Sequence, residues 1–121
     1  MTEKKTTKWL RRIPVAGEKI ADRVEGGPLV NVLRLDGVIG RASGPRRGGM
    51  ALSDMAESIE KAFKGPQLSA VALAINSPGG SPVQSALIAT RIRALAAENE
   101  VPVYAFCEDV AASGGYWLAC A

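Results

Sequence analysis

The stretch SAVALAINSPGGSPVQS, residues 69–85, contains the change of backbone structure that decides the fold. Its first part, residues 69–75, is a continuous apolar run, which is typical of a strand buried on both faces of a sheet. The Pro-Gly-Gly sequence at 78–80 predicts a tight turn that ends this strand. Ser81 and Pro82 follow as a good N-cap and first residue of a helix. The stretch therefore predicts one strand–turn–helix unit.

Similar units are predicted on both sides of this stretch. Strands are expected at 29–36, 69–75 and 101–107, and helices at 53–64, 82–98 and from 113 onward. Ser53 is expected to cap the first helix. The residues expected to face the core from the first two helices are Met55, Ile59, Phe63, Leu87, Ile88, Ile92 and Leu95. This alternation predicts an α/β fold with parallel strands and flanking helices in layers.

Length, composition and charge limit the class of protein. The 121 residues suffice for one small domain, and an apolar content of 47% favours a globular fold over disorder. Residues 1–48 hold eleven Lys and Arg against five acidic residues, whereas the remainder holds four against seven. No nucleic-acid-binding motif accompanies the basic residues, so we expect no nucleic-acid partner. Residues 1–28 are expected to form a basic N-terminal arm that is solvated, packs on a neighbour or touches a membrane surface.

The cysteines and the apolar segments indicate the cellular setting. Cys107 and Cys120 form no CxxC pair and the chain has no histidine, so we expect no zinc or other metal site and no cofactor. Both cysteines are expected to be small, buried core residues in a reducing compartment. The longest apolar block, residues 68–75, is far shorter than the roughly 18 residues of a membrane span. The N-terminus lacks the apolar core of a signal peptide, so we expect a cytoplasmic location.

Two loops carry the candidate chemistry, and each follows a strand and precedes a helix. Such loops meet at the carboxyl edge of a parallel sheet, where ligands bind in open α/β folds. In the loop at 76–81, Gly79 and Gly80 have N–H groups that a ligand can approach closely, which suits an oxyanion, although an ordinary tight turn has the same composition. In DVAASGGYW at 109–117, small neighbours flank Ser113 at a helix N-terminus. This position suits either a nucleophile or an ordinary N-cap.

The pair INSPGGSPVQS and EDVAASGGYWLACA resembles the signal peptide peptidase A family, the SppA- and SohB-like serine peptidases of the ClpP/crotonase superfamily. The resemblance covers about residues 29–121. The NSPGG element is shared with ClpP protease, whereas AASGGY separates the two, because ClpP-like sequences usually carry methionine where this chain has Gly114. The resemblance implies a ClpP/crotonase-like layered fold, of which residues 29–121 are the N-terminal part.

The resemblance also implies roles for individual residues. Ser113 matches the nucleophile, which forms an acyl-enzyme with the scissile carbonyl. The N–H groups of Gly80 and Gly114 match the oxyanion-hole donors, with Gly79 shaping the turn. The residues expected to border the substrate groove are Ser81, Pro82, Val83 and Gln84. A homo-oligomer is also implied.

The general base implied by the resemblance is a lysine with a lowered pKa, at a position beyond residue 121. Lys61 and Lys64 do not match that position, and we expect both to be solvated. The chain is therefore expected to be the N-terminal portion of a longer peptidase.

Three functions are compatible with these features. The leading one is a Ser/Lys endopeptidase that cleaves hydrophobic peptides such as signal-peptide remnants. A crotonase-like enzyme that processes acyl-CoA would use the same oxyanion chemistry with acidic catalytic residues and would not need Ser113. A catalytically silent fragment or homologue with an assembly role would leave Ser113 unlabelled by serine-reactive probes.

Overall fold

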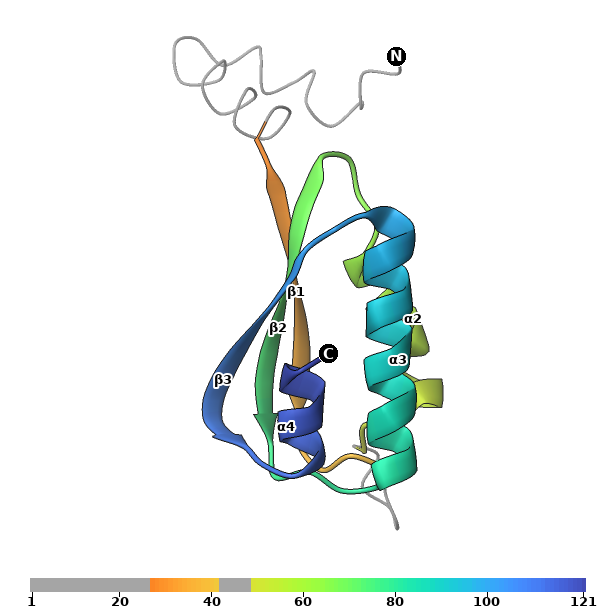
Figure 1. The fold of residues 1–121 in the computed structure, drawn as a ribbon, viewed down its shortest axis with the longest axis vertical. Coiled ribbons are helices and arrows are strands. Elements are labelled where there is room, and N and C mark those ends of the chain that lie inside the picture. The colour runs from red at the N-terminus through yellow and green to blue at the C-terminus, as the bar shows by residue number, and fades with distance from the viewer. Residues whose placement is uncertain (1–26, 42–48) are drawn as a thin grey trace, which may run out of the picture.

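The computed structural model describes residues 27–41 and 49–121, so nearly all of the expected N-terminal arm lies outside the described residues. The elements are β1 (Leu29–Asp36), α2 (Leu52–Ala62), β2 (Leu68–Ser77), α3 (Pro82–Asn99), β3 (Val103–Ala111) and α4 (Gly114–Ala119). The three strands form one parallel sheet in the order β1-β2-β3 (Figure 1). The predicted α/β layered fold with parallel strands is confirmed.

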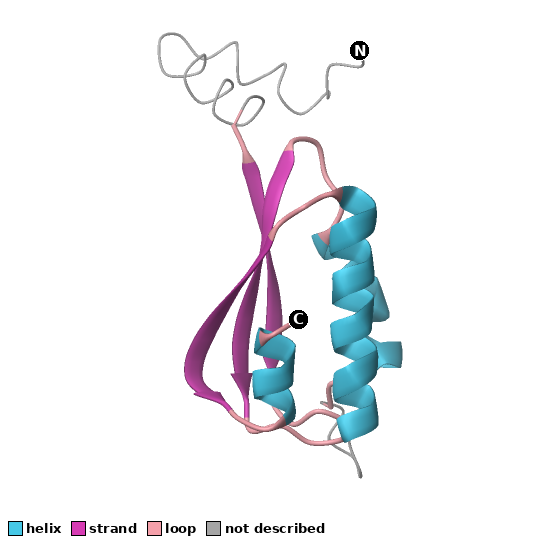
Figure 2. Cartoon of the chain, viewed as in Figure 1, coloured by secondary structure: helices cyan, strands magenta, loops and turns pink. Residues whose placement is uncertain are grey.

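The helices of the described chain all cover the same face of the sheet (Figure 2). Alternate residues of β2 show this arrangement, because Val71, Leu73 and Ile75 are buried while the alanines between them are only half-buried. Burial of residues 69–75 on both faces, which the apolar run predicted, is therefore not found within the described chain. The run is apolar throughout, but the helices lie on one side only.

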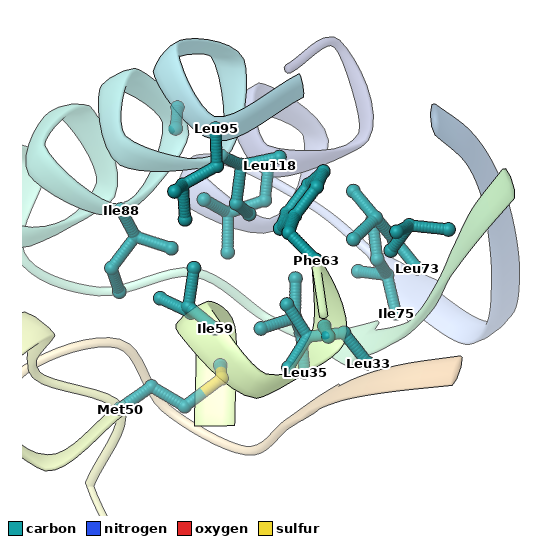
Figure 3. Close-up of a cluster of buried hydrophobic side chains, with 14 of the residues drawn as sticks. Leu33, Leu35, Met50, Ile59, Phe63, Leu73, Ile75, Ile88, Leu95 and Leu118 are labelled. Atoms are coloured by element: carbon teal, nitrogen blue, oxygen red, sulfur yellow. The ribbon is translucent and has the colours of Figure 1, made fainter. Parts of the chain in front are cut away.

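The hydrophobic core lies between this face of the sheet and the helices. Figure 3 shows Ile59, Ile88 and Leu118, from three different helices, converging with Leu35 and Ile75 of the sheet. All five side chains are fully buried. Burying a side chain of this size stabilises the fold by about 1.5–3 kcal/mol, so these contacts fix the helices on the sheet.

Three further predictions of burial are wrong, and the packing explains each. Leu87 is 44% exposed because it lies on the outer side of α3, whereas Ile88 is fully buried. Cys107 is exposed because, in the described part of the chain, β3 pairs only with β2 and no helix covers its middle. Cys120 is exposed directly after the end of α4. Apolar character alone did not reveal which side of each element faces the core.

Helix α2 is capped by a residue distant in sequence, and not by Ser53 as predicted. The helix begins at Leu52, one residue earlier than expected, so Ser53 lies inside the first turn. The side-chain oxygen of Gln84 accepts the Leu52 N–H at 2.8 Å and thereby caps the helix from α3.

Among the helices of the described residues, none has both the length and the apolar character that crossing a membrane requires.

The capping contact leads to a testable difference between two polar residues. Gln84→Ala is expected to lower the free energy of unfolding by about 1 kcal/mol, because the Leu52 N–H loses its partner. Ser53→Ala, which removes only an exposed hydroxyl bonded to its neighbour Asp54, is the control and should change stability by less than about 0.5 kcal/mol. Urea unfolding of both variants measures this difference. Equal effects of the two substitutions would contradict the assignment of the cap.

Candidate active site

The two loops singled out in the sequence meet at the carboxyl edge of the sheet, at the lower end of the molecule in Figure 1. Ser77 and Ala111, the last residues of β2 and β3, pair with each other. A Cβ atom placed on Gly79 would lie 2.7 Å from the Cβ of Ser113 and 2.9 Å from the backbone nitrogen of Gly114. The backbone of the first loop is therefore in direct contact with the serine of the second.

A bulge in β3 makes this contact possible. Ile75 pairs with Cys107, but Ser77, two residues further on, pairs with Ala111, four residues further on. The extra residues bend the strand, as bulges beside active sites commonly do. The side-chain oxygen of Asn76 accepts the N–H of Val110 at 3.2 Å and ties the bulge to β2. The predicted end of this strand at residue 107 was four residues too early, because no residue pattern marked the bulge.

Ser113 has a strained backbone, and its hydroxyl has no hydrogen-bond partner among the described residues. It occupies the N-cap position of α4, but its side chain makes no capping hydrogen bond. Its φ of 52° and ψ of −121° lie in a region that residues with a Cβ rarely adopt. Strain of this kind commonly accompanies functional sites, and a serine on a sharp strand-to-helix turn is typical of nucleophile elbows. Of the two roles that the sequence left open, side-chain capping is not the one observed.

Two backbone N–H groups near Ser113 are available to bind a negative charge. The Ile39 N–H donates to the Gly79 carbonyl at 2.9 Å, and the Ser81 N–H donates to the Ile39 carbonyl at 2.8 Å. Ile39 thus bonds to the residues on both sides of Gly80 in a parallel bridge, and the N–H of Gly80 itself is not bonded to Ile39. The N–H of Gly114 lies in the first turn of α4, where backbone N–H groups have no acceptor within the helix. In the hydrogen bonds recorded between described residues, neither group is a donor.

The four residues expected to border a substrate groove separate into two pairs. Ser81 caps α3 by accepting the N–H of Gln84 at 3.3 Å, which confirms its predicted position. The side chain of Gln84 is engaged in capping α2, as described above. Pro82 and Val83 are exposed at the start of α3, directly after the glycine loop. Of the four, only Pro82 and Val83 have exposed side chains, and both side chains are apolar.

The lysines of the described residues are solvated, as predicted. Lys61 and Lys64 have side chains that are 71% and 73% exposed. The Lys61 ammonium lies 2.6 Å from a carboxylate oxygen of Glu57, and its hydrogen bond and charge lower the pKa of Glu57 below the ordinary value. The Lys64 carbonyl accepts a hydrogen bond from Asn31, near the start of β1. Both lysines therefore lie toward the amino end of the strands, whereas Ser113 lies past their carboxyl end.

Comparison with known proteins places two proteases among the similar sequences. No family model matches the chain. Over 99 residues, or 79% of the chain, it is 35% identical to the chloroplastic serine protease SPPA of Arabidopsis thaliana. Over 63 residues, or 52% of the chain, it is 40% identical to Protease 4 of Salmonella typhi. The chain is thus similar to two proteins named as proteases.

A third similar sequence has a different name. Over 92 residues, or 76% of the chain, the chain is 51% identical to a protein of Brucella melitensis named Na(+)/H(+) antiporter NhaA. The matches cover 12% of the antiporter, 14% of SPPA and 10% of Protease 4. The chain therefore spans only about an eighth of the length of these relatives.

Proposed function

We propose that this chain contributes the nucleophile and oxyanion hole of a serine endopeptidase of the signal peptide peptidase A family. The observation that carries the proposal is the exposed Ser113, whose side chain makes no capping bond, on a strained turn in contact with the glycine loop. Similarity to SPPA and Protease 4 supports the same function. The name of the antiporter-named relative gives no role to the hydroxyl of Ser113 or to the glycine loop beside it.

The proposed reaction begins at the hydroxyl of Ser113. Its oxygen attacks the scissile carbonyl carbon, its proton passes to a general base, and the carbonyl oxygen becomes an oxyanion. The N–H groups of Gly80 and Gly114 donate to that oxyanion. The C–N bond then breaks, the amine leaves with the proton, and a water molecule hydrolyses the acyl-enzyme.

The general base in this proposal is a lysine outside the described residues. Lys61 and Lys64 do not serve, because both are solvated and lie toward the other end of the strands. A lysine acts as a base only when a dry or cationic environment lowers its pKa. The proposed lysine must therefore be covered by other parts of the protein when it faces Ser113.

The proposed substrates are extended, apolar peptides such as signal-peptide remnants. Apolar side chains are exposed on both sides of the loop contact: Val83 follows the glycine loop, and Tyr116 and Trp117 follow Ser113. Exposed apolar side chains beside a reactive group are a common feature of binding sites for apolar ligands. A homo-oligomer and a peripheral membrane contact of residues 1–28, both expected above, belong to the same proposal.

The proposed function is tested by offering two substrates to the protein. The protein is purified in the form that its host cells produce. We expect an apolar peptide to be cleaved, with release of a new amino terminus, and an unsaturated acyl-CoA to be left unchanged. Hydration of the acyl-CoA with an intact peptide would favour the crotonase-like alternative. Turnover of neither substrate would favour a catalytically silent homologue.

A further inference from the structure

We propose that Ser77 is a positioning residue that holds the oxyanion loop against Ser113. This inference rests on the proposed function and adds a residue to it. Ser77 is the last residue of β2, and its side chain is fully buried. Burial separates its hydroxyl from any substrate, so its effect must pass through the groups that it contacts.

The hydroxyl of Ser77 joins two loops by two hydrogen bonds. It donates to the carbonyl oxygen of Gly37, in the turn after β1, at 2.6 Å. It accepts the N–H of Gly79 at 3.1 Å. A buried hydroxyl that both donates and accepts fixes the direction of each partner, because a buried polar group without a partner is destabilising. The N–H of Gly79 is thereby bonded to Ser77, whereas the N–H of Gly80 has no acceptor among the described residues.

The backbone of Ser77 contacts the loop that carries the nucleophile. Its carbonyl oxygen accepts the N–H of Ala112, the residue before Ser113, at 3.1 Å. A Cβ placed on Gly115 would lie 2.5 Å from that same oxygen and 3.2 Å from the Cβ of Ser77. The first turn of α4 therefore packs directly on Ser77. One buried residue thus holds the glycine loop through its side chain and the Ser113 loop through its backbone.

Removing the hydroxyl of Ser77 separates its side-chain contact with the glycine loop from its backbone contact with the Ser113 loop. Ser77→Ala keeps the backbone bond to Ala112 and frees the Gly79 N–H and the Gly37 carbonyl from their partner. The glycine loop then keeps its two backbone hydrogen bonds to Ile39 but loses the one that orients the Gly79 N–H, while the Ser113 loop keeps its bond to the Ser77 carbonyl. Because oxyanion donors act on the transition state more than on the bound substrate, kcat should fall more than KM changes.

The test compares peptide hydrolysis and covalent labelling of Ser113 by a fluorophosphonate in the wild-type protein and the variants. Ser77→Ala is expected to lower kcat and the labelling rate by about 10- to 100-fold, with KM changed by less than about threefold. Ser77→Cys fills the space of the hydroxyl with a larger thiol that hydrogen-bonds only weakly, so it should show a similar loss. If Ser77→Ala does not fold, the Ser77→Cys variant tests the role of the Ser77 hydroxyl in its place.

The control for a general loss of stability is Ile92→Val, which shortens a fully buried side chain on α3. It should lower the urea midpoint yet leave kcat and the labelling rate within about twofold of wild type. Equal labelling of wild type and both Ser77 variants would overturn the role of Ser77 while leaving the proposed function standing. Absence of labelling in the wild-type protein would overturn the proposed function and the role of Ser77 together.

Discussion

Replacing Ser113 with alanine is expected to abolish peptide hydrolysis, with kcat falling by about 10³- to 10⁶-fold. The substitution removes the oxygen that forms the acyl-enzyme, and neither glycine N–H can replace it. The folded state should be almost unaffected, because the hydroxyl is exposed and makes no capping bond. The free energy of unfolding should therefore change by less than about 0.5 kcal/mol.

A second serine provides the control for this prediction. Ser69 is exposed near the start of β2, where its hydroxyl donates to the carbonyl of Gln67 at 3.2 Å. Ser69→Ala should leave both peptide hydrolysis and stability near the wild-type values. The assay is steady-state hydrolysis of one apolar peptide by both variants. Hydrolysis that survives in Ser113→Ala would contradict the assignment of the nucleophile.

Replacing Gly79 with alanine is expected to lower kcat/KM by at least about 100-fold, because the new methyl group would push the two loops apart. Its Cβ would lie 2.7 Å from the Cβ of Ser113, 2.9 Å from the carbonyl oxygen of Ala112 and 2.9 Å from the nitrogen of Gly114. Two of these atoms belong to the backbone and cannot move independently of the loop. The φ of +100° adds strain, so stability should also fall, by about 1–3 kcal/mol.

Gly65 provides a matched control for the strain at Gly79. It also has a positive φ, of +141°, and a Cβ there would lie 2.8 Å from the end of the flexible Leu29 side chain. Gly65 precedes β2, at the other end of the strands from Ser113. Gly65→Ala should therefore lower stability while kcat/KM stays within about threefold of wild type. If Gly79→Ala and Gly65→Ala both lost activity in proportion to their loss of stability, the contact between the two loops would not be the cause of the lost activity.

The order of elements could be predicted from the sequence because each element carries its own local signal. The continuous apolar run at 69–75 marked a strand, and Ser81 with Pro82 marked a helix start that the structure confirms. The face that each element buries was harder to predict. Leu87 and Ile88 are both apolar and adjacent, yet only Ile88 faces the core, since burial depends on how α3 lies on the sheet.

The site could be predicted in part for the same reason. Glycine-rich turns after two parallel strands placed Gly79 and Ser113 at one edge of the sheet, and the structure brings them into contact. The bulge in β3, the cap from Gln84 and the hydrogen bond from Ser77 to Gly37 were not predicted. Each joins residues more than 30 positions apart, and the partner is determined by strand register and not by neighbouring residues. Such contacts become visible only once the register is known.

Covalent labelling tests the central claim, that Ser113 is an activated nucleophile, most directly. The protein as its host cells produce it is treated with a fluorophosphonate, and the modified residue is located by mass spectrometry of its peptides. We predict one adduct per chain, on Ser113, and none on the Ser113→Ala variant. A wild-type protein that stays unmodified, or that is modified elsewhere with Ser113 free, would contradict the account.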